Sequence, residues 1–266
     1  MKNPSEQFAL KILKKTFIKK RAESVEFAKQ EMEIQKKLDH KNIVKVHNCG
    51  ENGIIKKANG NVIDGLFYLV MDYVNEGLMY DIIEHFEGVG ELVSRFFLKQ
   101  LLDSMEYLQE NQIVHRDLKL ENILVNAKME LKITDFGFAT YYNKNKTKGY
   151  GGTLSYMAPE VSELKLYDGY KADIFSMGVI FFITTIGNFP FPEGTKQDKY
   201  YNLLTSSKPE KVLRYWSQVG AEEASDEFKD LFSKMIAYKP SNRPSLKEIR
   251  EHPYMQMKVK TTDEKI

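Results

Sequence analysis

Three short polar motifs follow one another between residues 115 and 160, and each contains a residue type that can do chemistry. HRDLKLEN occupies residues 115–122, DFG occupies 135–137 and APE occupies 158–160. An aspartate such as Asp117 can accept a proton from a reacting hydroxyl, and Mg²⁺ prefers oxygen ligands such as carboxylates. An isolated HRD is often an ordinary loop, but here LKLEN follows it directly and DFG begins 13 residues beyond Asn122. Together these motifs supply a proton acceptor and oxygen ligands for a divalent cation, residue types that suit phosphoryl transfer, which depends mainly on positioning and charge neutralisation.

The first 75 residues, which must position one side of such a site, have the pattern of strands with one helix. Strands are predicted at residues 8–13, 42–48 and 53–57, and from a turn at 59–61 to residue 71. A helical pattern runs from Ser24, a suitable N-cap, to Leu38, with Phe27 and Ile34 on the same apolar face. We therefore expect a small β-rich lobe here.

The remainder of the chain is mainly helical. Helices are predicted at residues 91–109, 170–186, 228–236 and 245–251, short strands at 123–125 and 131–133, and a mobile loop at 140–152. The apolar segment 172–186 includes Asp173 and is too short and too polar to span a bilayer, so we expect a core helix. The sequence predicts an α+β, two-lobed fold, with lobes over residues 1–75 and 76–256 and a tail over 257–266. A ligand site is expected between the lobes.

Composition and charge argue against several classes of protein. The 266 residues are 42% hydrophobic and 29% charged with a formal net charge of +2, which gives no argument for nucleic-acid or membrane binding. A basic cluster over residues 11–21 is better interpreted as a solvated face than as a nucleic-acid or nuclear-import patch, because Glu23 and Glu26 follow it. Cys49 is the only cysteine, and the N-terminus lacks an apolar secretory segment. We expect a monomer in the cytoplasm, with the nucleus as the alternative location, and no nucleic-acid or membrane partner.

On these motifs the chain resembles a eukaryotic-type serine/threonine protein kinase over residues 6–256, and is most similar to the calcium/calmodulin-dependent and AMP-activated group. The resemblance implies a kinase-like fold, ATP and Mg²⁺ as cofactors, and protein substrates. It assigns Asp117 as the catalytic base and Lys119 as the cation that holds the γ-phosphate. Thr153 in GTLSYMAPE would brace the catalytic loop and favour serine or threonine as acceptor. Asn122 and Asp135 would bind the metal.

The resemblance also places a nucleotide-binding pair upstream. Lys11 in FALK is similar to the lysine that clamps the α- and β-phosphates. Glu31 is a carboxylate within the apolar face of the predicted helix, and a buried carboxylate must be paired or neutralised. We therefore expect an ion pair between Lys11 and Glu31.

Five further nucleotide-binding assignments rest on the resemblance alone. Met71 would be the gatekeeper, backbone groups of Asp72 and Val74 would bind adenine, and the side chains of Ala9 and Leu124 would enclose the base.

Two structural supports are also implied by the resemblance. Asp173 would bind the backbone of the catalytic loop, and Arg243 in SNRPS would pair with Glu160 of APE.

The chain departs from the family pattern before Lys11. No glycine occurs before Gly50, so the glycine-rich loop of the family is missing. The ten residues before Lys11 span at most about 36 Å when fully extended, which leaves the Lys11 strand as an uncovered sheet edge. We favour a truncated N-terminal lobe over a chain with impaired nucleotide binding.

Smaller departures concern regulation and specificity. At two positions the polarity differs from the family pattern: Gln35 stands where the family usually has an apolar residue, and Leu78 stands where it often has an acidic one. Gly149 stands where many relatives place an activating phosphothreonine that pairs with the arginine equivalent to Arg116. Thr147 and Tyr150 are the nearest alternative hydroxyls.

We therefore expect a protein serine/threonine kinase, and keep two other classes open. A non-catalytic pseudokinase that acts as a binding or scaffold module is favoured by the missing loop, but five residues suited to catalysis are retained: Lys11, Glu31, Asp117, Asn122 and Asp135. A small-molecule kinase is disfavoured because GTLSYMAPE resembles a peptide-docking segment. Phosphate transfer from labelled ATP, by this chain and by one extended upstream, would separate these classes.

Overall fold

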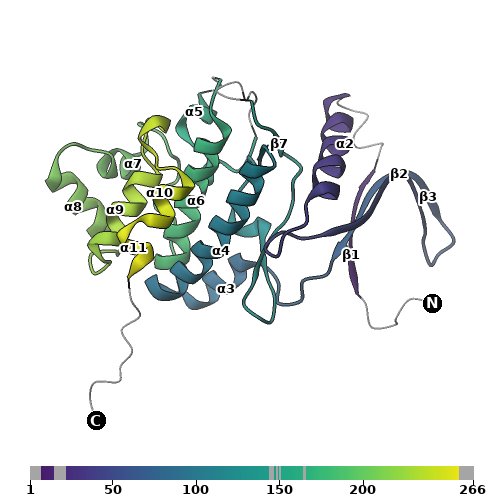
Figure 1. Cartoon of the computed structure of the whole chain (residues 1–266), viewed down its shortest axis with the longest axis horizontal. Helices are drawn as coiled ribbons and strands as arrows, with labels where there is room; N and C mark the ends of the chain where they lie inside the picture. The colour runs from purple at the N-terminus through teal and green to yellow at the C-terminus, as the bar shows by residue number, and fades with distance from the viewer. Residues whose placement is uncertain are drawn as a thin grey trace, which may run out of the picture.

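A computed structural model describes residues 7–14, 22–143, 147, 149, 151–163 and 166–257 of the chain. In it, a small strand-rich part with one helix lies beside a larger helical part (Figure 1). The predicted α+β architecture with these two parts is confirmed, while the domain limits at residues 75 and 256 stay predictions. Most of the basic cluster (15–21), Tyr150 and most of the predicted tail (258–266) lie outside the described residues.

The strand-rich part is an antiparallel sheet of β1 (Phe8–Lys14), β2 (Val46–Lys56) and β3 (Val62–Asp72) in the order β1-β3-β2. β2 and β3 form the predicted hairpin, whose turn holds Gly60 at φ +84°, a left-handed conformation that glycine adopts at little cost. Within the described ranges β1 pairs only with β3, so Lys11 lies on an edge strand, as predicted.

Helix α2 (Ala22–Lys37) covers one face of this sheet. Ala28 and Met32 pack with Phe67 and Leu69 of β3 in one apolar cluster. At the other end of the helix, Ile34 belongs to the core of the helical part. The helix therefore connects the two parts of the molecule, which matters because it also carries Glu31.

Two details of α2 differ from the prediction. The helix begins at Ala22 rather than after Ser24, because Ala22 and Glu23 are themselves able to continue a helix upstream; the N-cap assigned to Ser24 is wrong. Phe27 is 44% exposed although Ile34, on the same face, is buried. Phe27 lies about 10 Å earlier along the helix axis, away from the end that reaches the helical part.

The strand predicted from residue 42 also begins later, at Val46. The preceding backbone pairs instead with β6 (Leu131–Ile133): Ile133 donates to the carbonyl of Asn42 at 2.9 Å, and Val44 donates to the carbonyl of Ile133 at 2.9 Å. These residues join the sheet to the helical part, a long-range pairing that local alternation does not reveal.

The helical part contains α3 (Met79–Phe86), α4 (Gly90–Glu110), β4 (Ile113–Val114), η1 (Leu120–Asn122), β5 (Ile123–Val125), β6, β7 (Thr140–Tyr141), η2 (Leu154–Tyr156), α5 (Pro159–Ser162), α6 (Gly169–Ile186), α7 (Lys199–Leu204), α8 (Pro209–Gln218), α9 (Asp226–Met235), η3 (Pro240–Asn242), α10 (Leu246–Glu251) and α11 (Pro253–Gln256). The predicted pairing of β5 with β6 is confirmed. The sequence prediction lacks β4, β7 and the helices α3, α5, α7, α8 and α11, and β7 lies within the loop predicted at residues 140–152.

Helix α6 is the centre of this part and packs against α4 and α9 (Figure 1). The prediction that this segment is too short and too polar to span a bilayer is wrong, because the helix extends to Gly169 and is long and apolar enough by length and composition alone. The expected core helix is nevertheless observed, since 78% of α6 is buried inside the protein. The carboxylate of Asp168 caps its start by accepting hydrogen bonds from the backbone N–H groups of Tyr170 and Lys171. This cap fixes where the helix begins and so where Asp173, one turn later, lies.

Candidate active site

The loop that carries Asp117 runs between β4 and η1 and is anchored by α6. The buried carboxylate of Asp173 accepts hydrogen bonds from the backbone N–H of His115 at 2.8 Å and of Arg116 at 2.9 Å. These bonds hold Arg116 at φ +70°, a conformation that costs free energy in a residue other than glycine. Burial raises the pKa of Asp173 to about 7, although both N–H donors lower it. The predicted contact between Asp173 and the loop backbone is confirmed.

Asp117, Lys119 and Thr153 form one hydrogen-bonded group. The Nζ atom of Lys119 lies 3.1 Å from Oδ2 of Asp117 and donates to Oγ1 of Thr153 at 2.8 Å. The hydroxyl of Thr153 donates to Oδ1 of Asp117 at 3.2 Å. The three residues predicted as catalytic therefore lie together, although Thr153 is 34 residues beyond Lys119.

Asn122 and Asp135 lie on neighbouring segments. The amide nitrogen of Asn122 donates to the backbone carbonyl of Asp117 at 2.9 Å and to its Oδ2 at 3.1 Å, so the amide oxygen is the end suited to a cation. The backbone carbonyl of Asn122 accepts from the N–H of Thr134 at 2.9 Å. Because Thr134 directly precedes Asp135, this bond places Asn122 next to the DFG segment. One carboxylate and one amide oxygen fit Mg²⁺, which takes few protein ligands and keeps phosphate and water oxygens.

Lys11 lies between two carboxylates. Its Nζ is 2.6 Å from Oε1 of Glu31, which confirms the predicted ion pair, and 2.9 Å from Oδ1 of Asp135. Burial lowers the pKa of Lys11, but the two carboxylates outweigh it and the net pKa is raised. The pKa of Asp135 is lowered, so its charged form is also favoured. Burial raises this pKa, but the attraction of Lys11 and the hydrogen bond from the N–H of Gly137 together lower it by more.

The pKa of Glu31 is raised as well, which for a carboxyl group disfavours the charged form. Burial raises its pKa by more than the attraction of Lys11 lowers it, whereas the raised pKa of Lys11 indicates a stabilised charge. We take the ion pair as the state at neutral pH, because a separation of 2.6 Å is that of a short, charge-assisted hydrogen bond.

Helix α2 also contacts the segment that follows Asp135. The side-chain amide of Gln30 donates to the carbonyl of Ala139 at 2.8 Å. The ring of Phe136 is fully buried and lies 4.8 Å from the ring of His115. At Gly137 an added Cβ atom would lie 3.1 Å from Oδ1 of Asp135, so a side chain there would crowd the carboxylate. The DFG motif, α2 and the catalytic loop thus form one packed unit.

The apolar residues assigned to the base also lie together. Ala9 and Met71 are directly opposite each other in the β1–β3 register, and Leu78 forms an isolated bridge with Leu124. Ala9, Val74 and Leu124 pack against the apolar cluster that contains Met71. The positions agree with the resemblance, and their role in binding adenine stays a prediction.

Asp72 has several of its groups already engaged. Its backbone N–H donates to the carbonyl of Lys45 at 3.0 Å, and its Oδ1 lies 2.6 Å from Nε2 of His47. If Asp72 binds adenine through its backbone, as the resemblance implies, it must do so through its carbonyl.

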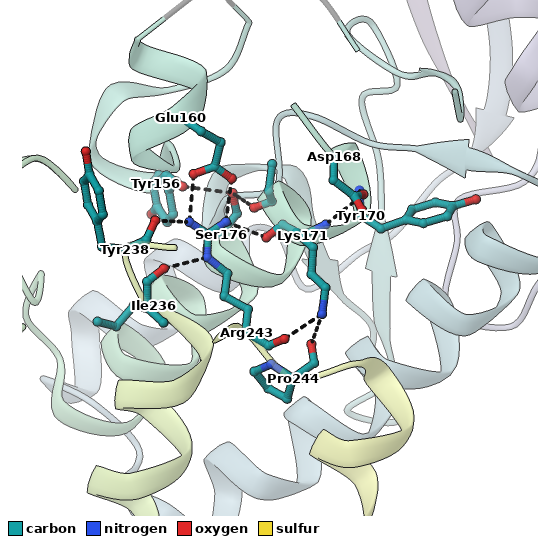
Figure 2. Close-up of polar contacts among 12 residues, drawn as sticks. Tyr156, Glu160, Asp168, Tyr170, Lys171, Ser176, Ile236, Tyr238, Arg243 and Pro244 are labelled. Carbon is teal, nitrogen blue, oxygen red and sulfur yellow. Dashed lines mark hydrogen bonds and ion pairs between the residues drawn. The ribbon is translucent and has the colours of Figure 1, made fainter. Parts of the chain in front are cut away.

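Glu160 and Arg243 form a buried ion pair, drawn in Figure 2. The Nη1 and Nη2 atoms of Arg243 donate to Oε1 and Oε2 of Glu160 at 2.6 and 2.8 Å. The guanidinium also donates to the carbonyls of Ala237 and Lys171, both at 2.8 Å. The predicted pair is confirmed, and it joins α5 to the C-terminal helices.

Arg116 contacts Gly149 and Tyr167, and Tyr167 in turn pairs with Thr147. The guanidinium of Arg116 donates to the carbonyl of Gly149 at 3.2 Å and to the hydroxyl of Tyr167 at 3.0 Å. Thr147 is buried and pairs with Tyr167 through its backbone. Sequence reasoning missed Tyr167, because nothing in the local pattern distinguishes it from the other tyrosines of the chain.

Comparisons with known proteins define the class of this chain. The family described as protein kinase domain matches residues 1–255. A probable serine/threonine-protein kinase, CCRP1 from Zea mays, is 34% identical over 230 residues, which are 85% of this chain and 33% of the relative. Aurora kinase A-B from Xenopus laevis is 31% identical over 93% of this chain and 55% of its own length. The probable serine/threonine-protein kinase MARK-C from Dictyostelium discoideum is 30% identical over 94% of this chain and 30% of its own length.

The chain therefore belongs to the protein kinase domain family. Its relatives are serine/threonine kinases and include members of the MARK and SIK groups, in agreement with the predicted resemblance. The chain spans 55% or less of the length of the three relatives described above.

Proposed function

We propose that this chain transfers the γ-phosphoryl group of ATP to serine or threonine hydroxyls of protein substrates in a Mg²⁺-dependent reaction. The observation that carries the proposal is the position of Asp117. Its Oδ1 accepts from Thr153, and its Oδ2 lies within 3.1 Å of both Lys119 and Asn122. A carboxylate held on both oxygens is aimed in one direction, which a general base requires.

In this proposal Asp117 accepts the proton of the substrate hydroxyl as that oxygen attacks the γ-phosphorus. Thr153 keeps the carboxylate in place and contacts Lys119, so acceptor and cation are positioned together. Lys119 is a compact cation that offsets the negative charge of the transferred phosphoryl group.

The nucleotide would be held from the sheet side. Lys11, fixed by Glu31 at 2.6 Å, is the cation for the α- and β-phosphates. Ala9, Met71 and Leu124 supply an apolar surface for the base, with hydrogen bonds from the backbone at residues 72 and 74. Asn122 and Asp135 would hold the metal, which when bound neutralises phosphate charge.

The test is substitution of Asp117 by asparagine. Asparagine has the same shape but accepts no proton, so turnover should fall by about 10²–10⁴, the usual contribution of a positioned general base. Phosphate transfer from labelled ATP to a generic protein substrate measures the rate. Asp64→Asn, at an exposed position of β3, is the matched control and should leave the rate unchanged. Full activity of the Asp117→Asn variant would refute the assignment.

A non-catalytic pseudokinase is the second candidate. The observation that favours it is the sheet edge, because in the part of the chain that the structure describes β1 pairs only with β3. A wild-type chain that binds ATP with Mg²⁺ but transfers phosphate no faster than the Asp117→Asn variant would support this alternative. The monomeric state, the cytoplasmic or nuclear location and the lack of nucleic-acid and membrane partners stay predictions.

A further inference from the structure

Arg116 links the catalytic loop to other parts of the chain through its backbone and its side chain. The backbone N–H of Arg116 donates to Asp173 on α6 at 2.9 Å. Its Nε donates to the hydroxyl of Tyr167 at 3.0 Å, and its Nη2 donates to the carbonyl of Gly149 at 3.2 Å. Because Arg116 directly precedes Asp117, whatever fixes this guanidinium also fixes the approach to the proposed base.

Tyr167 contacts the same segment a second time, through its backbone. Its N–H donates to the carbonyl of Thr147 and its carbonyl accepts from the N–H of Thr147, both at 3.3 Å. Only 4% of Tyr167 and 5% of Thr147 is exposed. Burial raises the pKa of the Tyr167 hydroxyl although Arg116 lowers it, so the phenol is neutral at physiological pH and accepts a hydrogen bond from the guanidinium.

Gly149 supplies a backbone carbonyl to Arg116 rather than a side-chain hydroxyl. Its φ of +95° is one that L side chains rarely adopt, so a phosphorylatable residue would be strained at this position. At Gly151 an added Cβ atom would lie 3.3 Å from Nη2 of Arg116 and 2.9 Å from the ring of Phe138. The glycines therefore allow the backbone to approach the guanidinium closely.

Thr147 is poorly placed to carry an activating phosphate. Its hydroxyl is buried and has no hydrogen-bond partner among the described residues. A phosphate on that oxygen would place about two negative charges in a buried position, which costs much free energy without a partner. The bridge between Thr147 and Tyr167 would have to open first.

We propose that Tyr167 is a positioning residue whose hydroxyl holds Arg116 and whose backbone holds Thr147 in the catalytic arrangement, without phosphorylation of Thr147. The inference rests on the proposed kinase function. It goes beyond that function because it concerns regulation. The guanidinium of Arg116 donates to a neutral phenol and to a glycine carbonyl, although a guanidinium in this place could otherwise bind a phosphate. The unmodified chain should then be active.

The first test is Tyr167→Phe, which removes the hydroxyl and keeps the ring. The value of kcat should fall about 10-fold or more, the usual worth of a hydrogen bond to a charged group. The KM for ATP should be unchanged, because within the described part of the chain Tyr167 has no hydrogen bond or ion pair with a residue assigned to the nucleotide. Tyr170→Phe is the matched control: its hydroxyl donates to the carbonyl of Gln109 at 3.3 Å, and its loss should leave kcat unchanged.

The second test measures hydrogen exchange at the amides of Thr147 and Tyr167 in phosphatase-treated chain. Both amides should be protected in the wild type, about tenfold less protected in Tyr167→Phe, and unaffected in Tyr170→Phe. The inference is overturned if these amides are unprotected in the dephosphorylated wild type, or if Tyr167→Phe leaves their protection unchanged, whatever its rate. A wild-type chain that transfers no phosphate would refute the proposed function, whereas the exchange measurement would still decide the role of Tyr167.

Discussion

Replacing Glu160 by glutamine should lower the free energy of unfolding by about 3–5 kcal/mol, because it leaves the guanidinium of Arg243 buried without a counter-charge. The side chain of Arg243 is 0% exposed and that of Glu160 12%. Glutamine has nearly the size of glutamate, so the substitution removes charge while it keeps the packing. Folded domains are stable by about 5–15 kcal/mol in total, so the loss is a large fraction.

The hydrogen bonds of Arg243 explain why Glu160→Gln should destabilise the fold less than Arg243→Ala does. Both carboxylate oxygens of Glu160 accept from Arg243, whereas glutamine offers one acceptor and turns an N–H₂ group toward the guanidinium. The carbonyls of Ala237 and Lys171 still accept from Arg243 in this variant, which limits the loss. Arg243→Ala should cost more, because these carbonyls lose a partner at about 1–3 kcal/mol each.

A double substitution separates the pair from the packing. Glu160→Gln combined with Arg243→Met should be less destabilising than the sum of the two single changes by up to about 3 kcal/mol, because the second change removes the unpaired charge. This coupling is specific to the ion pair. If the two substitutions only loosened the packing, their losses of unfolding free energy would simply add.

Urea unfolding measured by the fluorescence of Trp216 is the assay. Trp216 is the only tryptophan of the sequence and is buried on α8, in the same part as Arg243. Glu251→Gln is the control, because Glu251 lies 3.9 Å from Lys247 in an exposed pair worth about 0–1 kcal/mol. If Glu160→Gln shifts the midpoint no more than Glu251→Gln does, the buried ion pair is not a stabilising contact and the reasoning is refuted.

Two further predictions concern other buried polar groups. Gln35 is fully buried and, among the described residues, neither its amide nitrogen nor its oxygen has a hydrogen-bond partner; Gln35→Leu should therefore raise the free energy of unfolding by about 1–3 kcal/mol, and a decrease in urea unfolding would contradict this. The pKa of Asp173 is about 7 in the folded chain and 3.8 ordinarily, so the folded state binds this proton more tightly than the unfolded state. Its contribution to stability is complete below about pH 4 and is lost as the pH rises through 7, by up to about 1.4 kcal/mol per pH unit. Thermal unfolding across this range should show a shallower pH slope for Asp173→Asn than for the wild type, and equal slopes would exclude the effect.

Periodicity and motif spacing were enough to predict much of the fold. The alternation before residue 14 and the turn at Gly60 predict strand β1 and the β2–β3 hairpin, because side-chain period and turn chemistry are local properties. A carboxylate within an apolar helix face indicates that Glu31 needs a cation, and the structure supplies Lys11. The family resemblance, carried by the motifs, indicates in the same way that Asp173 and Arg243 have buried polar partners.

The sequence by itself therefore determined most of the elements around the site, the apolar helix face that holds Glu31, and the residue types at the site. Only the tertiary structure decided which distant residues meet: Lys11 reaches Asp135 across 124 positions, and Arg116 meets a tyrosine 51 positions away. It also decided that Phe27 is exposed and that residues 42–44 pair with β6 rather than extend β2. The physical reason is that backbone propensity and side-chain period act over a few residues. Contacts between elements depend instead on how whole helices and sheets pack, which no local pattern specifies.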